Sequence, residues 1–243
     1  MDISLLFYFL IFIVALLYAS VGHGGASGYL ALMGIWGISQ TSARPAALIL
    51  NCVVSVIAFI QYYRSGYFNF KLFVSLAAAS VPMAYIGGLF TLNEHLYKQI
   101  LGVLLLLTAL RFFIPLENTS GELRKPNMIY ILSMGAIIGL ISGLIGIGGG
   151  IILSPLLILF RWSDLKTSAG ISALFIFVNS LSGLAALSQK GFQVSENMMF
   201  MVVLAVGGGL LGSLFGARYL NIPVLNRVLG IVLGIASLKL ILL

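Results

Sequence analysis

The stretch SGLIGIGGGIILSP, residues 142–155, decides the fold of this chain, because it interrupts an apolar segment with four glycines. Glycine inside a helix costs about 1 kcal/mol relative to alanine, so Gly146, Gly148, Gly149 and Gly150 together predict a broken helix. A membrane tolerates a broken helix only where the freed backbone is buried in protein or lines a cavity. The stretch therefore predicts two apolar half-helices that meet at a functional break.

A second glycine-rich stretch, SVGHGGASGY at residues 20–29, repeats this pattern near the N-terminus. The glycines of the two stretches align at an offset of 124 residues (146 minus 22), from Gly22 with Gly146 to Gly25 with Gly149. Interrupted apolar segments at matching places in two halves are typical of transporter binding sites. The two breaks are not equivalent, because His23 stands at the position of an isoleucine in the second stretch.

The composition is that of an integral membrane protein. Of the 243 residues, 60% are hydrophobic and 8% are charged, whereas a soluble domain carries roughly 25% charged residues. The formal net charge of +7 indicates cationic loops that face anionic lipid, and we expect no nucleic-acid partner. The sequence contains no nucleotide-binding P-loop and no metal-ligand spacing, so we expect neither a cofactor nor a metal. The single Cys52 excludes an intramolecular disulfide.

Ten apolar segments predict an all-α integral membrane protein. It has two homologous halves of about four helices each, residues 1–114 and 128–243, joined by a loop at 115–127, and glycine breaks the first helix of each half. The segments are 3–20, 27–38, 42–63, 71–91 and 96–114 in the first half, and 128–145, 151–160, 166–188, 198–219 and 223–243 in the second. We expect the glycine runs outside the breaks, at 87–88 and 207–209, to pack helices together.

The loop charges favour inverted-topology repeats. In the first half residues 64–71 are positive and 94–98 are balanced, whereas in the second half 190–196 are balanced and 218–227 are positive. Because positive loops face the cytoplasm, corresponding loops are expected on opposite sides of the membrane. Parallel repeats, with each broken helix crossing fully, remain the alternative.

The residues quoted so far, together with the ALILN run at 47–51, resemble the TauE/SafE sulfite exporter family over essentially the whole chain. The resemblance implies a multi-pass transporter of the bacterial inner membrane. It also implies a small sulfur-containing anion as substrate, such as sulfite, thiosulfate or a small organosulfonate, and transport without ATP. The sequence leaves open whether the protein forms a homo-oligomer.

The helix starts after the two breaks are the candidate binding site. Helix N-termini leave N–H groups unpaired, carry partial positive charge, and bind anions that glycines allow to approach closely. We therefore expect the backbone at the two breaks to face one shared central cavity, through Gly24, Gly25, Ala26, Gly148, Gly149 and Gly150.

Polar side chains near the breaks complete the candidate site: His23, Ser27, Asn51, Thr167, Ser168 and, for attracting anions, Arg44. His23 could donate to the anion, carry a proton or bind backbone carbonyls. Thr167 and Ser168 could equally be a helix cap, and Arg44 could extend to lipid headgroups.

Two other functions fit parts of the sequence. Residues 25–28 match the GxSG string of rhomboid intramembrane serine proteases, but Ser27 would need a base within hydrogen-bond reach. The second half has Ile151 at the equivalent position, so the duplication retains no nucleophile. A channel for small anions is the other alternative. We expect a transporter and not an enzyme.

Overall fold

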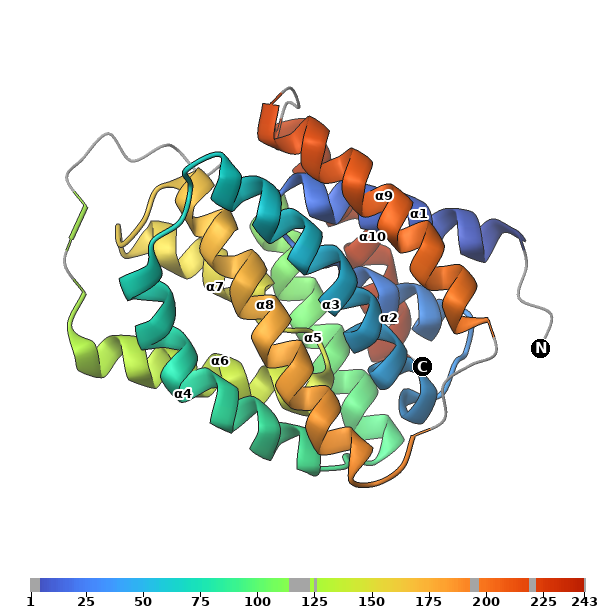
Figure 1. The fold of residues 1–243 in the computed structure, drawn as a ribbon. Helices are drawn as coiled ribbons and strands as arrows, with labels where there is room; N and C mark the ends of the chain where they lie inside the picture. Colours follow the sequence, from blue (N-terminus) through green and yellow to red (C-terminus); the bar gives the residue numbers. More distant parts are fainter. Residues whose placement is uncertain (1–4, 114–122, 125, 193–196, 219–221, 243) are drawn as a thin grey trace.

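The chain folds into α-helices throughout the part that the structure, a computed structural model, describes: residues 5–113, 123–124, 126–192, 197–218 and 222–242 (Figure 1). These residues contain ten helices and no strand, which confirms the all-α prediction. The helices are α1 (Leu5–Ser20), α2 (Ala26–Ile35), α3 (Gln40–Arg64), α4 (Phe70–Leu89), α5 (Glu94–Phe113), α6 (Met128–Ile145), α7 (Gly150–Leu159), α8 (Leu165–Ser188), α9 (Met198–Arg218) and α10 (Ile222–Leu242).

Short polar side chains set where several helices begin. The side-chain oxygens of Asn69, Asn93, Asn127 and Asp164 accept first-turn N–H groups of α4, α5, α6 and α8. Such caps satisfy donors that have no partner inside the helix. The helix α3 begins two residues before its predicted start, because Ser39 has an extended backbone and forms its N-cap. The predicted ends at residues 3, 114, 219 and 243 lie outside the described residues.

The packing of the helices repeats when each helix of the first half is exchanged with its counterpart in the second. The helix α4 packs on α6 as α9 packs on α1, and α4 packs on α8 as α9 packs on α3. Figure 1 shows α3 beside α8 through the middle of the molecule, with α4 and α6 on one side and α1 and α9 on the other. The helices of the two halves are therefore interleaved. Their inverted orientation stays a prediction.

Glycines let the outer helix pairs approach closely. A methyl group on Gly139 or Gly143 of α6 would lie 2.2 or 1.9 Å from a backbone oxygen of α4. A methyl on Gly208 or Gly212 of α9 would likewise lie 2.4 or 2.0 Å from a backbone oxygen of α1. Small residues at such interfaces are typical of membrane helix packing. The prediction that the run at 207–209 packs helices is confirmed for Gly208.

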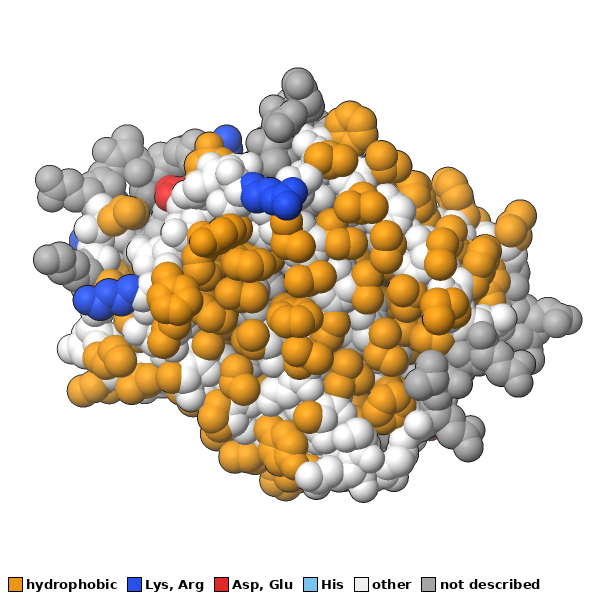
Figure 2. Space-filling view, viewed as in Figure 1, with side chains coloured by type: hydrophobic (Ala, Val, Ile, Leu, Met, Phe, Trp, Pro, Cys, Tyr) orange, Lys and Arg blue, Asp and Glu red, His pale blue; other side chains and the backbone are white. Residues whose placement is uncertain are grey.

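The outer surface is apolar, as a lipid-facing surface must be. Five helices are long and apolar enough to cross a membrane, namely α3, α4, α6, α8 and the first 18 residues of α9. Large hydrophobic side chains such as Leu107, Ile137 and Val203 are exposed. Figure 2 shows hydrophobic side chains over most of one face, with the few Lys and Arg side chains near its edges. The structure thus supports a multi-pass membrane protein.

Candidate functional site

Both predicted helix breaks are present, and they have similar local geometry. Residues 21–25 separate α1 from α2, and residues 146–149 separate α6 from α7. The N-cap residues, Gly25 before α2 and Gly149 before α7, have φ angles of 95° and 78°. This left-handed conformation is readily adopted only by glycine. The glycines therefore turn the chain sharply and start a new ten-residue helix after each break.

The side chain of Asn51, on α3, lies between the two breaks. Its Oδ1 accepts the N–H of Ala26, the first residue of α2, at 3.2 Å, and its Nδ2 donates to Ser180 Oγ on α8 at 2.9 Å. A methyl on Gly24 would lie 2.0 Å from Asn51 Oδ1, and a methyl on Gly148 would lie 2.2 Å from Asn51 Nδ2. Asn51 is 1% exposed. The structure therefore brings both breaks against one buried amide.

A second polar chain connects the first break with α7 and α8. His23 Nδ1 is 2.9 Å from the carbonyl oxygen of Val21, and because a carbonyl only accepts, Nδ1 carries the hydrogen. The other ring nitrogen, Nε2, lies 3.4 Å from Ser154 Oγ on α7. Ser154 in turn donates to Ser172 Oγ on α8 at 2.7 Å. His23 thus contacts the helix that follows the second break, as a side chain shared by both halves of one site would.

Two buried hydroxyl groups beside the breaks, those of Tyr29 and Ser142, have no hydrogen-bond partner among the described residues, and the buried hydroxyl of Ser168 in the first turn of α8 has none either. A methyl on Gly25 would lie 3.1 Å from the Tyr29 hydroxyl oxygen, and a methyl on Gly149 would lie 3.4 Å from Ser142 Cβ. Most buried polar groups in proteins are hydrogen-bonded. Unpaired hydroxyls at both breaks are therefore available donors for a ligand.

The structure does not bring Thr167 to the Asn51 side chain. Its hydroxyl donates to Asp164 Oδ2 at 2.7 Å, and its N–H donates to Asp164 Oδ1 at 3.0 Å, at the exposed start of α8. Partial burial raises the pKa of Asp164, but the hydrogen bonds from Thr167 and Lys166 lower it further, so the net pKa lies below its ordinary value. This geometry supports the helix-cap interpretation for Thr167.

Arg44 is buried, which makes the headgroup interpretation of this residue wrong. Its side chain is 3% exposed. One guanidinium nitrogen donates to the carbonyl of Gly143 at 2.9 Å, and the other donates to that of Phe90 at 3.3 Å. These carbonyls lie near the C-terminal ends of α6 and α4, where the partial negative charge of the helix favours a cation. Arg44 therefore stabilises the helix end that leads into the second break.

Sequence analysis missed several polar residues of this region: Tyr29, Ser154, Ser172 and Ser180. Ser172 is four residues after Ser168 on α8, a spacing that places the two side chains on one face of the helix, whereas Ser180, twelve residues after Ser168, lies about a third of a turn away. The four-residue spacing was the available signal for Ser172. Ser27, by contrast, was expected to bind the substrate, and its hydroxyl is paired with that of Tyr18 at 2.9 Å.

Apolar helices, an interleaved bundle and a buried polar centre at two helix breaks define the class of a multi-pass membrane transporter. The chain belongs to the sulfite exporter TauE/SafE family, whose sequence profile matches residues 7–240. The resemblance found in the sequence is thereby confirmed. Membership of a transporter family also makes the intramembrane protease alternative wrong, because this is not an enzyme class.

Curated relatives carry transporter names. The chain is 31% identical over 95% of both chains to the probable membrane transporter protein y4hK of Sinorhizobium fredii. It is 26% identical to YjnA of Bacillus subtilis over 94% of this chain and 96% of the relative. It is also 26% identical to MJ0441 of Methanocaldococcus jannaschii, over 71% and 68% of the two chains. Both are named probable membrane transporter proteins. No solved structure matches the chain.

Proposed function

We propose that this protein is a secondary transporter of sulfite, thiosulfate or small organosulfur anions, and that it binds its substrate between the two glycine breaks. The observation that carries the proposal is the position of Asn51, whose amide contacts both Gly24 and Gly148. The proposed membrane is a bacterial inner membrane, and the proposed transport uses no ATP.

The groups around Asn51 would bind an anion through neutral hydrogen-bond donors and not through a positively charged side chain. At the start of α7, Ile152 and Leu153 donate their N–H groups to the carbonyl of Gly149. The N–H groups of Gly150 and Ile151 are therefore the ones at the start of α7 without a backbone acceptor among the described residues, and no side chain caps this end. The Asn51 Nδ2 group and the hydroxyls of Tyr29 and Ser142 add neutral donors. Hydrogen bonds to a charged group contribute about 1.5–3 kcal/mol each, more than bonds between neutral groups. Several such donors can replace the water that a small anion loses.

The two breaks would contribute unequally. The first N–H of α2 is already bound to Asn51 Oδ1, whereas the start of α7 has no side-chain partner. We therefore expect the anion to bind mainly at α7, and to take the Asn51 Nδ2 donor from Ser180. An anion bound at α7 would then also affect His23, because His23 contacts Ser154 on the same helix.

The test combines a ligand screen with transport by purified protein in liposomes. Sulfite, thiosulfate, sulfate, taurine, sulfoacetate and simple carboxylates are screened by thermal unfolding. A ligand at 100 times its Kd stabilises by about 2.7 kcal/mol. Any ligand found is then assayed for saturable uptake and for counter-transport. Non-saturating flux without counter-transport would make the protein a channel and contradict the proposal.

A matched pair of variants locates the site. Asn51→Asp keeps the oxygen that binds Ala26 N–H and replaces the donor to Ser180 by an acceptor, so it should abolish anion binding. Asn179→Asp is the control, because Asn179 is equally buried on α8 but donates only to its own helix, at Phe175 O. Equal loss of binding in the two variants would place the site away from the breaks.

A further inference from the structure

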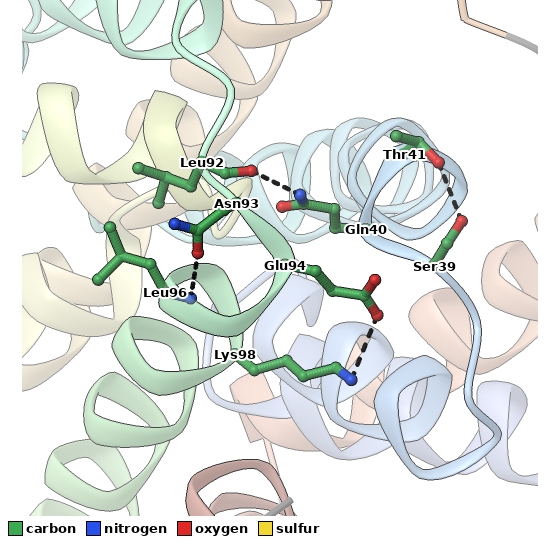
Figure 3. A network of polar contacts seen from close by, with 8 residues as sticks. All are labelled: Ser39, Gln40, Thr41, Leu92, Asn93, Glu94, Leu96 and Lys98. Atoms are coloured by element: carbon green, nitrogen blue, oxygen red, sulfur yellow. Dashed lines mark hydrogen bonds and ion pairs between the residues drawn. The ribbon is translucent and has the colours of Figure 1, made fainter.

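A small cationic pocket lies where α3 begins and where α4 and α8 end. Its volume is about 100 Å³, enough for several water molecules or one small oxyanion. The polar residues that line it are Gln40, Thr41, Arg44, Thr91 and Lys190. Figure 3 shows how the start of α3 is fixed here, since Gln40 Nε2 donates to the carbonyl of Leu92, in the segment between α4 and α5, at 2.7 Å.

The charge of this pocket is positive. Arg44 and Lys190 contribute two formal charges, and none of the described aspartate or glutamate residues lines the pocket. The C-terminal ends of α4, α6 and α8 each supply about half a negative charge, and the N-terminus of α3 supplies about half a positive charge. A net charge of about +1 therefore remains. Thr91 Oγ1 accepts from Lys190 Nζ at 2.6 Å, which holds the ammonium at the pocket.

The pocket is adjacent to the second glycine break. A methyl on Gly146 would lie 3.5 Å from Arg44 Cγ. Arg44 also lines the pocket, so its side chain alone lies between the pocket and the break. Arg44 and Asn51 are seven residues apart on α3, about 10 Å along the helix axis. Two helical turns thus connect this pocket with the amide that contacts both breaks.

We propose that this pocket is a second anion site, a vestibule that captures the substrate before it reaches the breaks. The inference rests on the proposed function, because it assigns the vestibule to the same small sulfur oxyanion or sulfonate. The ammonium of Lys190 and the hydroxyls of Thr41 and Thr91 are exposed and would bind the anion. The buried guanidinium of Arg44 would attract it inward while remaining bound to its carbonyls.

The test measures saturable uptake of sulfite or thiosulfate into liposomes, with the anion added on the side of Lys190. Lys190→Gln should raise KM about fivefold, the attraction between unit charges about 4 Å apart in water, and leave the maximal rate nearly unchanged. It should also weaken the dependence of the rate on ionic strength. Lys190→Arg, which keeps the charge, should restore the KM.

Lys98→Gln is the matched control. Lys98 lies at the start of α5, close to Gln40 in Figure 3, and its removal changes the charge of the same end by the same amount. Its ammonium is paired with Glu94 at 3.2 Å and does not line the pocket. Equal KM values for the two glutamine variants would overturn the vestibule. Absence of uptake by the wild-type protein for every anion screened would instead overturn the proposed function.

Discussion

The substitution Gly24→Ala tests the proposed site with a single methyl group. Gly24 does not require a positive φ, so alanine is compatible with its backbone. The added methyl would lie 2.0 Å from Asn51 Oδ1 and 2.9 Å from the Asn51 carbonyl oxygen, whereas ordinary contacts are 3.4–4 Å. The Asn51 side chain must therefore move by more than 1 Å. Its hydrogen bonds to Ala26 N–H and Ser180 Oγ would then be lost.

The expected cost follows from these contacts. Two hydrogen bonds of about 1 kcal/mol each are lost, and overpacking adds about 1–3 kcal/mol. We expect destabilisation of about 3–5 kcal/mol, with loss of anion binding in the protein that remains folded. The assays are thermal unfolding in detergent and a direct binding titration on monodisperse protein.

Gly208→Ala is the control for this experiment. Its methyl would lie 2.4 Å from the backbone oxygen of Phe12, so α1 and α9 must separate while Asn51 stays in place. We expect comparable destabilisation but normal anion affinity. Normal binding by Gly24→Ala together with lost binding by Gly208→Ala would refute the reasoning. Gly149 is a poorer test, because a methyl there would meet Ile138 at 2.7 Å and Phe175 at 3.1 Å, and so disturb the core.

Two further predictions concern helix ends, and a third concerns the orientation of two loops. Arg44→Met should cost about 1–3 kcal/mol in unfolding experiments, because the Gly143 and Phe90 carbonyls lose their donor; a neutral effect would contradict the buried position. Asp164→Ala should cost about 1 kcal/mol in unfolding experiments, because α8 loses its N-cap. Folding lowers the pKa of Asp164, so the stability that this residue contributes should be present above about pH 4 and lost as the pH falls through the lower pKa of the folded protein. An unchanged unfolding profile between about pH 6 and 3 would contradict this. Cysteine labelling on a Cys52→Ala background should place the loops at 64–71 and 218–227 on the same side of the membrane, and labelling from opposite sides would favour parallel repeats.

The sequence predicted the helices and breaks well, because both depend on local chemistry. Apolar length determines a membrane helix, and the clustered glycines at the two breaks end one where most of them adopt a positive φ, whereas the glycines at 207–209 continue α9. The boundaries that shifted depend on caps, as at Ser39, whose extended backbone starts α3 earlier than the apolar pattern indicates. The orientation of the repeats depends on the membrane, so loop charge remains its main sequence signal.

The site was predicted less completely, because its partners lie far apart in the sequence. Asn51 was expected to bind substrate, but its contact with Ser180 spans 129 residues. Serines in apolar helices commonly bond their own backbone, so composition does not distinguish Ser172 or Ser180 from ordinary packing residues. Arg44 was ambiguous for a similar reason, since its carbonyl partners come from the ends of α4 and α6.

The contacts of Asn51 also suggest how a substrate could be transported as well as bound. The Asn51 side-chain amide forms hydrogen bonds with the start of α2 and with α8, and it also contacts the break before α7. An anion that takes the Nδ2 donor from Ser180 removes a link between α3 and α8, whereas an anion bound at α7 adds contacts on the other side of the same amide. A ligand shifts a conformational equilibrium only by its difference in affinity for the two states. Because the substrate would form bonds at one break and release a bond at the other, Asn51 supplies such a difference at the point where the two halves meet.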